Sequence, residues 1–338
     1  MIKPRASRSL GAAISLFFLA PLVAEFLLGN LPITLLPALV MLAPMYGGGA
    51  LLIRELARRA GRGWPSIVLL ALAYGMLEEA FTTQSLFNSN YLKLNLHLLD
   101  HAYIAPLGIG GHWTIFVLTL HVAWSISAPI ALIEAAVPDR AETPWLGPVG
   151  LFVTAFLFAL GIVGTTAMSY RTDHFLSSAA QFATSGIAIV VLALVAFVLP
   201  KTPAVSANWT PNPWLVGALA LAAGSAVLLI PAEWGWYAAA AILLLDLGLA
   251  AAVLFWSRQS TWNLLHTLAL GGGAALAYAW HAFVEKPVIG SGGHSVRIGN
   301  AVFALAALVL ITFAAKQSAH SIRTKAGLQS TAPAQRTL

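Results

Sequence analysis

Apolar stretches of about 20 residues recur along the whole chain, and this pattern limits the possible fold more than any motif does. A helix rises roughly 1.5 Å per residue, so about 20 apolar residues cross the hydrocarbon core of a bilayer. Of the 338 residues, 59% are hydrophobic and 9% are charged, whereas roughly 25% are charged in a soluble domain. The sequence therefore predicts an all-α, polytopic transmembrane helical bundle that forms a single integral membrane domain over residues 1–338.

We expect about ten membrane spans, and a basic tail, residues 316–338, that is disordered. Lys3, Arg5 and Arg8 precede the first apolar run, and no small-x-small cleavage site follows, which indicates an uncleaved first span instead of a signal peptide. The predicted spans are approximately residues 10–29, 32–53, 64–84, 112–136, 146–168, 176–199, 213–230, 235–256, 262–284 and 300–315.

The distribution of Lys and Arg predicts the orientation of these spans. If the N-terminus is cytoplasmic, 14 of the 18 basic residues lie in inside segments and four lie outside, at Lys93, Arg171, Lys286 and Arg297. Cytoplasmic loops carry an excess of Lys and Arg. Both termini are therefore predicted to be cytoplasmic, in an integral membrane protein of the bacterial cytoplasmic (inner) membrane.

Charge and cysteine content exclude several kinds of function. The net charge of +6 comes from basic residues beside apolar spans, so we expect contact with the lipid bilayer and no nucleic acid. Anionic lipids are the expected partners of the run Arg54–Arg62, in which Glu55 and Arg59 are spaced for a helical ion pair. The absence of cysteine excludes disulfides, thiol catalysis and cysteine-based metal sites.

Two adjacent carboxylates, Glu78 and Glu79, lie inside the third predicted span. Ionisable side chains in hydrocarbon are costly and usually face the bundle interior, where they carry function. Glu78 shares a helical face with small and polar residues, and Glu79 lies about 100° round the helix. We therefore expect Glu78 to be the inward carboxylate.

A histidine on the next predicted span lies at a similar depth. His121 is about 13 Å below the outer edge of its helix, and Glu78 is about 21 Å above the inner edge, in a core roughly 30 Å thick. Ser125 follows His121 by one helical turn, and Glu25 and His281 also fall in the outer half. We predict that Glu78 faces His121, with Glu25 or His281 completing a polar pocket. Buried carboxylates suit general-base catalysis.

Other ionisable residues admit two interpretations each. Asp246 and His266 are expected to form a buried pair, with either a structural or a proton-transfer role. His97, Asp100 and His101 could bind a metal or belong to an exposed interfacial segment. Glu285 follows His281 by one helical turn.

The sequence GMLEEAFTTQ, followed by a histidine on the next helix in FVLTLHVAWS, resembles the CAAX-processing and bacteriocin-immunity (CPBP) intramembrane protease family. That family carries the motifs E-E-x-x-x-R, F-x-x-x-H and H-x-x-x-N/D. The resemblance implies that Glu78, Glu79 and His121 activate a water against a peptide bond. Thr83 stands at the arginine position, and Phe116 precedes His121 by five residues instead of four. Ser125 replaces the Asn or Asp, and His281 with Glu285 is the nearest third motif.

Three classes of function stay open on the sequence alone. The protein is a multi-pass membrane protein whose buried Glu/His cluster serves an intramembrane hydrolase, a proton-coupled transporter or lipid carrier, or a structural role. A divalent metal such as zinc is a possible cofactor, with Glu78, His121 and His281 as candidate ligands.

Overall fold

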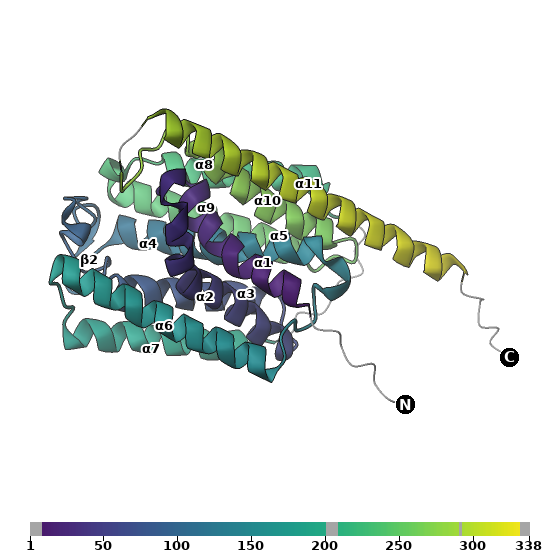
Figure 1. The fold of residues 1–338 in the computed structure, drawn as a ribbon, viewed down its shortest axis with the longest axis horizontal. Helices are drawn as coiled ribbons and strands as arrows, with labels where there is room; N and C mark the ends of the chain where they lie inside the picture. Colours follow the sequence, from purple (N-terminus) through teal and green to yellow (C-terminus); the bar gives the residue numbers. More distant parts are fainter. Residues whose placement is uncertain (1–8, 201–208, 291–292, 332–338) are drawn as a thin grey trace.

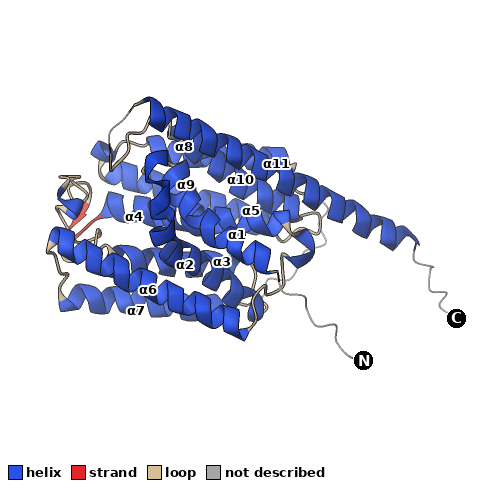
Figure 2. Cartoon of the chain, viewed as in Figure 1, coloured by secondary structure: helices blue, strands red, loops and turns tan. Residues whose placement is uncertain are grey.

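The computed structural model describes residues 9–200, 209–290 and 293–331. In this part of the chain most of the backbone is helical (Figure 2), and the only strands are the two-residue pair β1 (Tyr103–Ile104) and β2 (Ile109–Gly110), which form an antiparallel hairpin. The all-α, polytopic bundle predicted from the sequence is confirmed.

Several helices contain π-helical or 3-10 segments, labelled η. The elements in chain order are α1 (Leu10–Pro21), η1 (Leu22–Leu27), η2 (Ile33–Ala38), α2 (Leu39–Arg59), α3 (Trp64–Leu77), η3 (Glu78–Thr82), η4 (Tyr91–Lys93), α4 (Gly111–Leu120), η5 (His121–Ser127), α5 (Ala128–Ala136), η6 (Pro138–Arg140), α6 (Pro148–Asp173), α7 (Ala179–Val198), α8 (Pro213–Leu229), η7 (Ala232–Trp234), α9 (Trp236–Trp256), α10 (Leu264–His281) and α11 (His294–Thr331).

Consecutive elements join into longer helices, such as α1 with η1 and α4 with η5 and α5, and the resulting ten helical segments correspond to the ten predicted spans. Among the described residues, eight of these segments are long and apolar enough to cross a membrane. The other two are α8, a shorter apolar helix of 17 residues, and α10, of 18 residues. α10 runs the length of the bundle, because Asn263 before it borders the same cavity as Trp64, and Ala282 after it packs on Gly29 after the first span.

The bundle has an internal group of helices and a more exposed periphery. The segments α1–η1, α3–η3 and α4–η5–α5 are half buried or more within their most apolar windows, whereas α6 and α7 are 11% buried there. In Figure 1, α6 and α7 lie along one side of the bundle, and α8 to α11 lie on the opposite side. Exposed apolar side chains such as Val149, Phe152 and Ile187 on the outer pair are suited to contact with lipid.

α1 begins and α11 ends at the same end of the bundle (Figure 1), and the positive-inside distribution predicts that this end faces the cytoplasm. The turn between α2 and α3 lies here too. In the last turns of α2, Glu55 forms an ion pair with Arg59 at 3.3 Å, as the spacing predicts.

The predicted lipid-facing role of the run Arg54–Arg62 is wrong for its first arginine. Arg54 is fully buried; its guanidinium pairs with Glu55 at 2.8 Å and with Glu134 at 3.0 Å and donates to the carbonyls of Ala141 and Thr143. Arg58 also binds Glu134, at 2.6 Å. A buried charge requires such partners, so these two arginines join α2 to α5 and to the following loop.

The long segment between η3 and α4 covers the opposite end of the bundle. Asn88 donates to the Asp173 carboxylate at 2.8 Å, and the backbone N–H of Leu92 donates to the same oxygen at 3.1 Å. Gln84 accepts from the backbone N–H of Ser177 at 2.7 Å. These contacts fasten the segment to the turn between α6 and α7.

The prediction of a disordered tail from residue 316 is wrong up to residue 331, because α11 continues to Thr331. Its first turns beyond the span are fixed to the bundle: Ser318 donates to the Ala135 carbonyl at 2.9 Å, and Ser321 donates to Asp139 at 2.9 Å. The helix then projects past the other helices (Figure 1). The part of the predicted tail after Thr331 lies outside the described residues.

Candidate functional site

Three buried ionisable side chains meet between α3–η3 and α4–η5. The Nε2 atom of His121 lies 2.7 Å from Oε1 of Glu79, and its Nδ1 atom lies 3.3 Å from Oε2 of Glu78. Glu78 is 2% exposed, Glu79 6% and His121 5%. The structure therefore brings together the three residues that the sequence indicated, with a carboxylate on each ring nitrogen of one imidazole.

Both glutamates reach the histidine because the helix widens where they lie. The residues Glu78–Thr82 form a π-helical turn, in which the N–H of Thr83 donates to the Glu78 carbonyl at 2.8 Å. Glu78 points inward as expected, and Glu79 does so as well, because the expectation of a 100° separation assumed the angular spacing of a regular α-helix. His121 begins a second π-helical segment. Such segments interrupt α-helices frequently at functional sites.

Gly75 permits the close approach of the two helices. A Cβ atom on Gly75 would lie 3.0 Å from Cβ of His121 and 3.1 Å from a methyl carbon of Leu118. Any side chain there would push the histidine away from the glutamates, which lie one turn further along α3.

Hydroxyl groups hold Glu79 and His121 in place. Oε2 of Glu79 accepts hydrogen bonds from Thr83, at 3.0 Å, and from Ser85. Trp113 in turn donates to Oγ of Ser85 at 3.0 Å. Oγ of Ser125 lies 3.2 Å from Nδ1 of His121, which gives this predicted neighbour a direct contact with the cluster.

Two tyrosines surround the imidazole on the Glu78 side. The Tyr46 ring stacks on His121 with centroids 6.3 Å apart, and the Tyr74 ring meets it edge-on at 5.9 Å. The Tyr46 hydroxyl donates to Glu25 at 2.6 Å, and Asn30 donates to the other Glu25 oxygen at 3.3 Å. Glu25 therefore joins the pocket through Tyr46, on a third π-helical segment, η1.

Two polar atoms beside this pocket are buried and make no hydrogen bond of good geometry among the described residues. They are the hydroxyl of Tyr74 and Oε2 of Glu78, whose contact with Nδ1 of His121 at 3.3 Å is an ion pair without hydrogen-bond alignment. Buried polar atoms nearly always have a hydrogen-bond partner, which can be an ordered water. The pair is therefore suited to hold a water or a polar group of a substrate next to the Glu78 carboxylate.

The cluster could also hold a metal. One ligand atom from each of Glu78, Glu79 and His121 lies within 4.8 Å of the others, and carboxylate oxygen with imidazole nitrogen suits zinc. In the present geometry each carboxylate lies on a different ring nitrogen. A single ion bound to one nitrogen would require the other carboxylate to move, so the arrangement fits proton sharing better than metal binding.

The remaining candidates lie away from the cluster. Asp246 accepts from Thr119 at 2.5 Å, whereas His266 stacks on Trp262 at 4.8 Å and contacts the Pro211 carbonyl at 3.1 Å. Their predicted pairing is wrong, because Asp246 is near the middle of α9 and His266 is in the first turn of α10. His281 lies 3.8 Å from Glu285 and is not part of the three-residue group.

The exposed outer segment does not gather the metal ligands predicted as one alternative. His97 binds Asp100 at 2.7 Å, with both side chains more than half exposed, and His101 packs against His112 at 6.4 Å. Within the described residues, Glu78, Glu79 and His121 form the one group with metal-ligand spacing. Burial, together with the carboxylates of Glu79 and Glu78, raises the pKa of the Tyr91 phenol.

Sequence reasoning missed Tyr46, Ser85 and Trp113. Tyr46 precedes the glycine run of the second span, and Ser85 follows the π-helical turn by three residues. Their aromatic and hydroxyl side chains are common in membrane helices, so only proximity to the glutamates distinguishes them. The available signal was the position of Tyr46 in the sequence, next to small residues within its predicted span.

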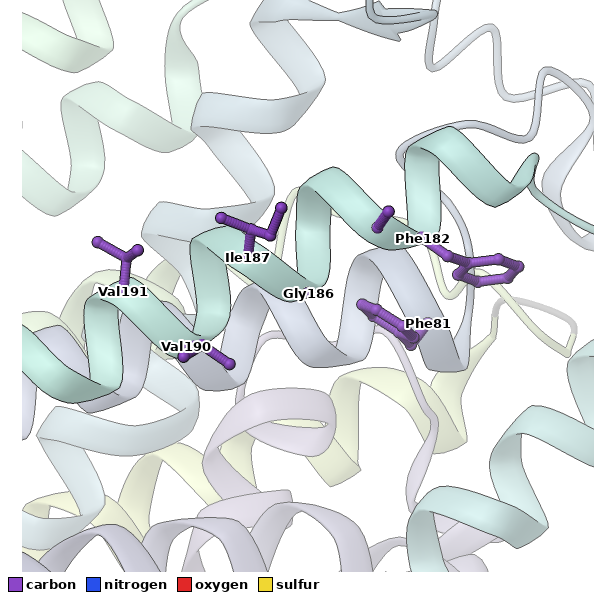
Figure 3. A pocket seen from close by; sticks show the side chains of 7 residues that line it. Phe81, Phe182, Gly186, Ile187, Val190 and Val191 are labelled. Carbon is purple, nitrogen blue, oxygen red and sulfur yellow. The ribbon is translucent and has the colours of Figure 1, made fainter.

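An apolar groove runs along the lipid-facing side of the same region (Figure 3). It has a volume of about 630 Å³ and is lined by Phe81 of η3 and by residues of α7 such as Phe182, Ile187 and Val190. Phe81 follows Glu79 by two residues and packs on Phe182 at 5.2 Å. The carboxylate turn thus separates the buried cluster from a surface suited to hydrocarbon.

Comparison with known proteins gives a family but no relative of known activity. No curated protein matches the chain, and no solved structure matches it. The model of a family described as an uncharacterized membrane protein family matches residues 14–328. This match covers all or most of each of the ten helical segments and includes Glu78, Glu79 and His121. The chain belongs to this uncharacterized membrane protein family.

Proposed function

We propose that the chain is an intramembrane hydrolase, similar in mechanism to the CPBP proteases, with Glu78 as its general base. The observation that carries this proposal is the placement of two adjacent carboxylates on the two nitrogens of one buried imidazole. A purely structural pairing of His121 requires one carboxylate. Glu78 supplies a second carboxylate, whose Oε2 lies 3.3 Å from Nδ1. Among the described residues this oxygen makes no hydrogen bond of good geometry, and neither does the Tyr74 hydroxyl beside it.

In the proposed mechanism each group of the cluster has a role. Glu78 removes a proton from a water, whose oxygen attacks the carbonyl carbon of a peptide bond. As the tetrahedral intermediate breaks down, the carbon–nitrogen bond cleaves and His121, protonated between the two carboxylates, gives a proton to the leaving amine. Glu78 then returns its proton to His121. Glu79, which is hydrogen-bonded to Thr83 and Ser85, keeps the imidazole oriented, a usual arrangement for a general acid.

A proton-coupled carrier is the second candidate. A cavity of about 680 Å³ at the predicted cytoplasmic end favours it. None of the residues of the Glu/His cluster lines this cavity, and buried apolar side chains such as Ile126 and Ile130 continue from the cluster towards that end. A carrier would require these helices to separate.

The test uses Glu78→Gln, which keeps the side-chain shape and removes the titratable carboxylate. The variant, the wild type and the control Glu233→Gln, at an exposed position in η7, are expressed in a strain lacking the gene. New protein N-termini are then compared by mass spectrometry. We expect cleavage products that depend on Glu78 and His121 and are unchanged in Glu233→Gln. Identical products in wild type and Glu78→Gln, at equal expression and thermal stability, would contradict the hydrolase.

A further inference from the structure

A cavity lined by both charged and apolar side chains, at the predicted cytoplasmic end of the bundle, has no part in the proposed reaction. It has a volume of about 680 Å³ and lies between the turns that precede α3 and α10, the end of α9, the loop around η6 and the extension of α11. Its distance from the Glu/His cluster, at the other end of α3, makes it an independent feature.

Opposite charges face each other across this cavity. The basic side chains are Arg58, Arg258 and Lys325, and the acidic ones are Glu134, Asp139 and Glu142. Arg58 and Glu134 neutralise each other at 2.6 Å. Lys325 is only loosely paired with Asp139, at 4.0 Å, and both are largely exposed.

The remaining two charges, Arg258 and Glu142, are exposed. Neither has an ion pair within the part of the chain that the structure describes. The exposed charged groups of the cavity are therefore two cations, Arg258 and Lys325, and two anions, Asp139 and Glu142. Such a set complements a zwitterion better than a simple anion.

The rim of the cavity is continuous with the lipid-facing surface. Leu254 borders the cavity and is 48% exposed on α9, where Leu247 and Phe255 are exposed as well. Trp64 and Trp262 also line it, and tryptophan is enriched where a membrane protein meets the headgroup region. A ligand with a polar head and apolar chains can therefore enter from the bilayer.

We propose that this cavity binds the headgroup of a zwitterionic, amine-bearing phospholipid, phosphatidylethanolamine. The phosphate is placed near Arg258 and Lys325, since guanidinium and ammonium groups bind phosphate through charge-assisted hydrogen bonds. The primary ammonium is placed near Glu142 and Asp139, and the acyl chains lie along Leu254. The proposed lipid contact therefore differs from the one predicted for the run Arg54–Arg62, because Arg54 and Arg58 form ion pairs within the protein.

The test measures lipid retained by the full chain. The protein is purified from detergent micelles supplemented with phosphatidylethanolamine, phosphatidylcholine or phosphatidylglycerol, and bound lipid is counted by native mass spectrometry. We expect phosphatidylethanolamine to bind best, because the quaternary amine of phosphatidylcholine cannot donate hydrogen bonds and phosphatidylglycerol has no amine. Arg258→Ala should weaken its binding about tenfold, the effect of losing one charge-assisted hydrogen bond.

Matched controls separate a specific site from surface charge. Arg297→Ala removes an exposed arginine at the start of α11, far along that helix from Lys325, and should leave binding unchanged. Glu142→Gln should reduce the preference for phosphatidylethanolamine over phosphatidylcholine. Thermal unfolding of each variant verifies its folding.

Three results would overturn the proposal. The first is equal or stronger binding of phosphatidylglycerol, and the second is equal loss in Arg258→Ala and Arg297→Ala. The third is binding of soluble glycerophosphoethanolamine as strong as that of the lipid, which would assign the cavity to a water-soluble ligand.

Discussion

Nε2 of His121 lies 2.7 Å from a carboxylate oxygen of Glu79, and Nδ1 of the same ring lies beside Glu78. Adjacent residues of a regular α-helix point about 100° apart, so two neighbouring glutamates rarely reach one side chain. The π-helical turn Glu78–Thr82 makes this possible. The site therefore depends on a local departure from α-helical geometry in addition to its residue types.

Gly75 should be intolerant of substitution. In Gly75→Ala the added methyl would lie 3.0 Å from Cβ of His121, and overpacking of this kind costs about 1–3 kcal/mol. Gly164→Ala is the control, since nothing lies within 4 Å of a Cβ there; alanine should be neutral or stabilising by about 0.5–1 kcal/mol. Thermal unfolding in detergent compares the two, and equal effects would contradict the close approach of α3 and α4.

Arg54 should be essential for stability. Removing its side chain in Arg54→Ala leaves Glu55 and part of Glu134 buried without a full set of partners, a change that typically costs about 3–5 kcal/mol. Folding yield and the unfolding midpoint measure the effect. The control Arg171→Ala removes an arginine outside this network and should be nearly silent. A fully stable Arg54→Ala protein would show that the network does not hold α2 to α5.

The two tyrosines of the pocket should differ in their contribution to stability. Tyr46→Phe removes the hydrogen bond to Glu25 at 2.6 Å and should destabilise the protein by about 0.5–1.5 kcal/mol. Tyr74→Phe removes a hydroxyl that has no hydrogen-bond partner among the described residues, so its effect on stability should be small. If Tyr74→Phe instead abolishes Glu78-dependent cleavage, the hydroxyl contacts water or substrate. The reverse order of stabilities would contradict the pocket geometry.

Metal content can be measured directly on the purified protein. Because each carboxylate lies on a different nitrogen of His121, we expect well below one equivalent of zinc by elemental mass spectrometry. His121→Ala and Glu78→Gln should then have the same content as the wild type. Zinc near one equivalent that is lost in His121→Ala would replace the metal-free mechanism with a metal-assisted one.

The orientation can be tested with single cysteines, since the chain has none of its own. Ala60→Cys lies in the turn after α2 and Asn95→Cys lies in the segment before β1, both at exposed positions. A membrane-impermeant thiol reagent added to whole cells should label position 95 and leave position 60 unlabelled. The opposite pattern would reverse the assigned cytoplasmic end.

The sequence by itself determined the class of fold, the ten helical segments and the three residues of the cluster. Span length follows from the thickness of the bilayer, and buried ionisable residues stand out in an apolar sequence because each is costly there. Span length and the cost of an ionisable residue are local properties of the sequence, so both can be recognised without knowing which helices are in contact.

Only the tertiary structure decided which ionisable groups meet. Glu79 points inward because of a π-helical turn. Arg54 pairs with Glu134 of α5, Asp246 accepts from Thr119 of α4, and His266 contacts the Pro211 carbonyl. These last three contacts join segments that are far apart in the chain. Helical periodicity assigns a residue to a face and a depth, whereas the choice among several possible partners follows from helix–helix packing, which no single segment encodes.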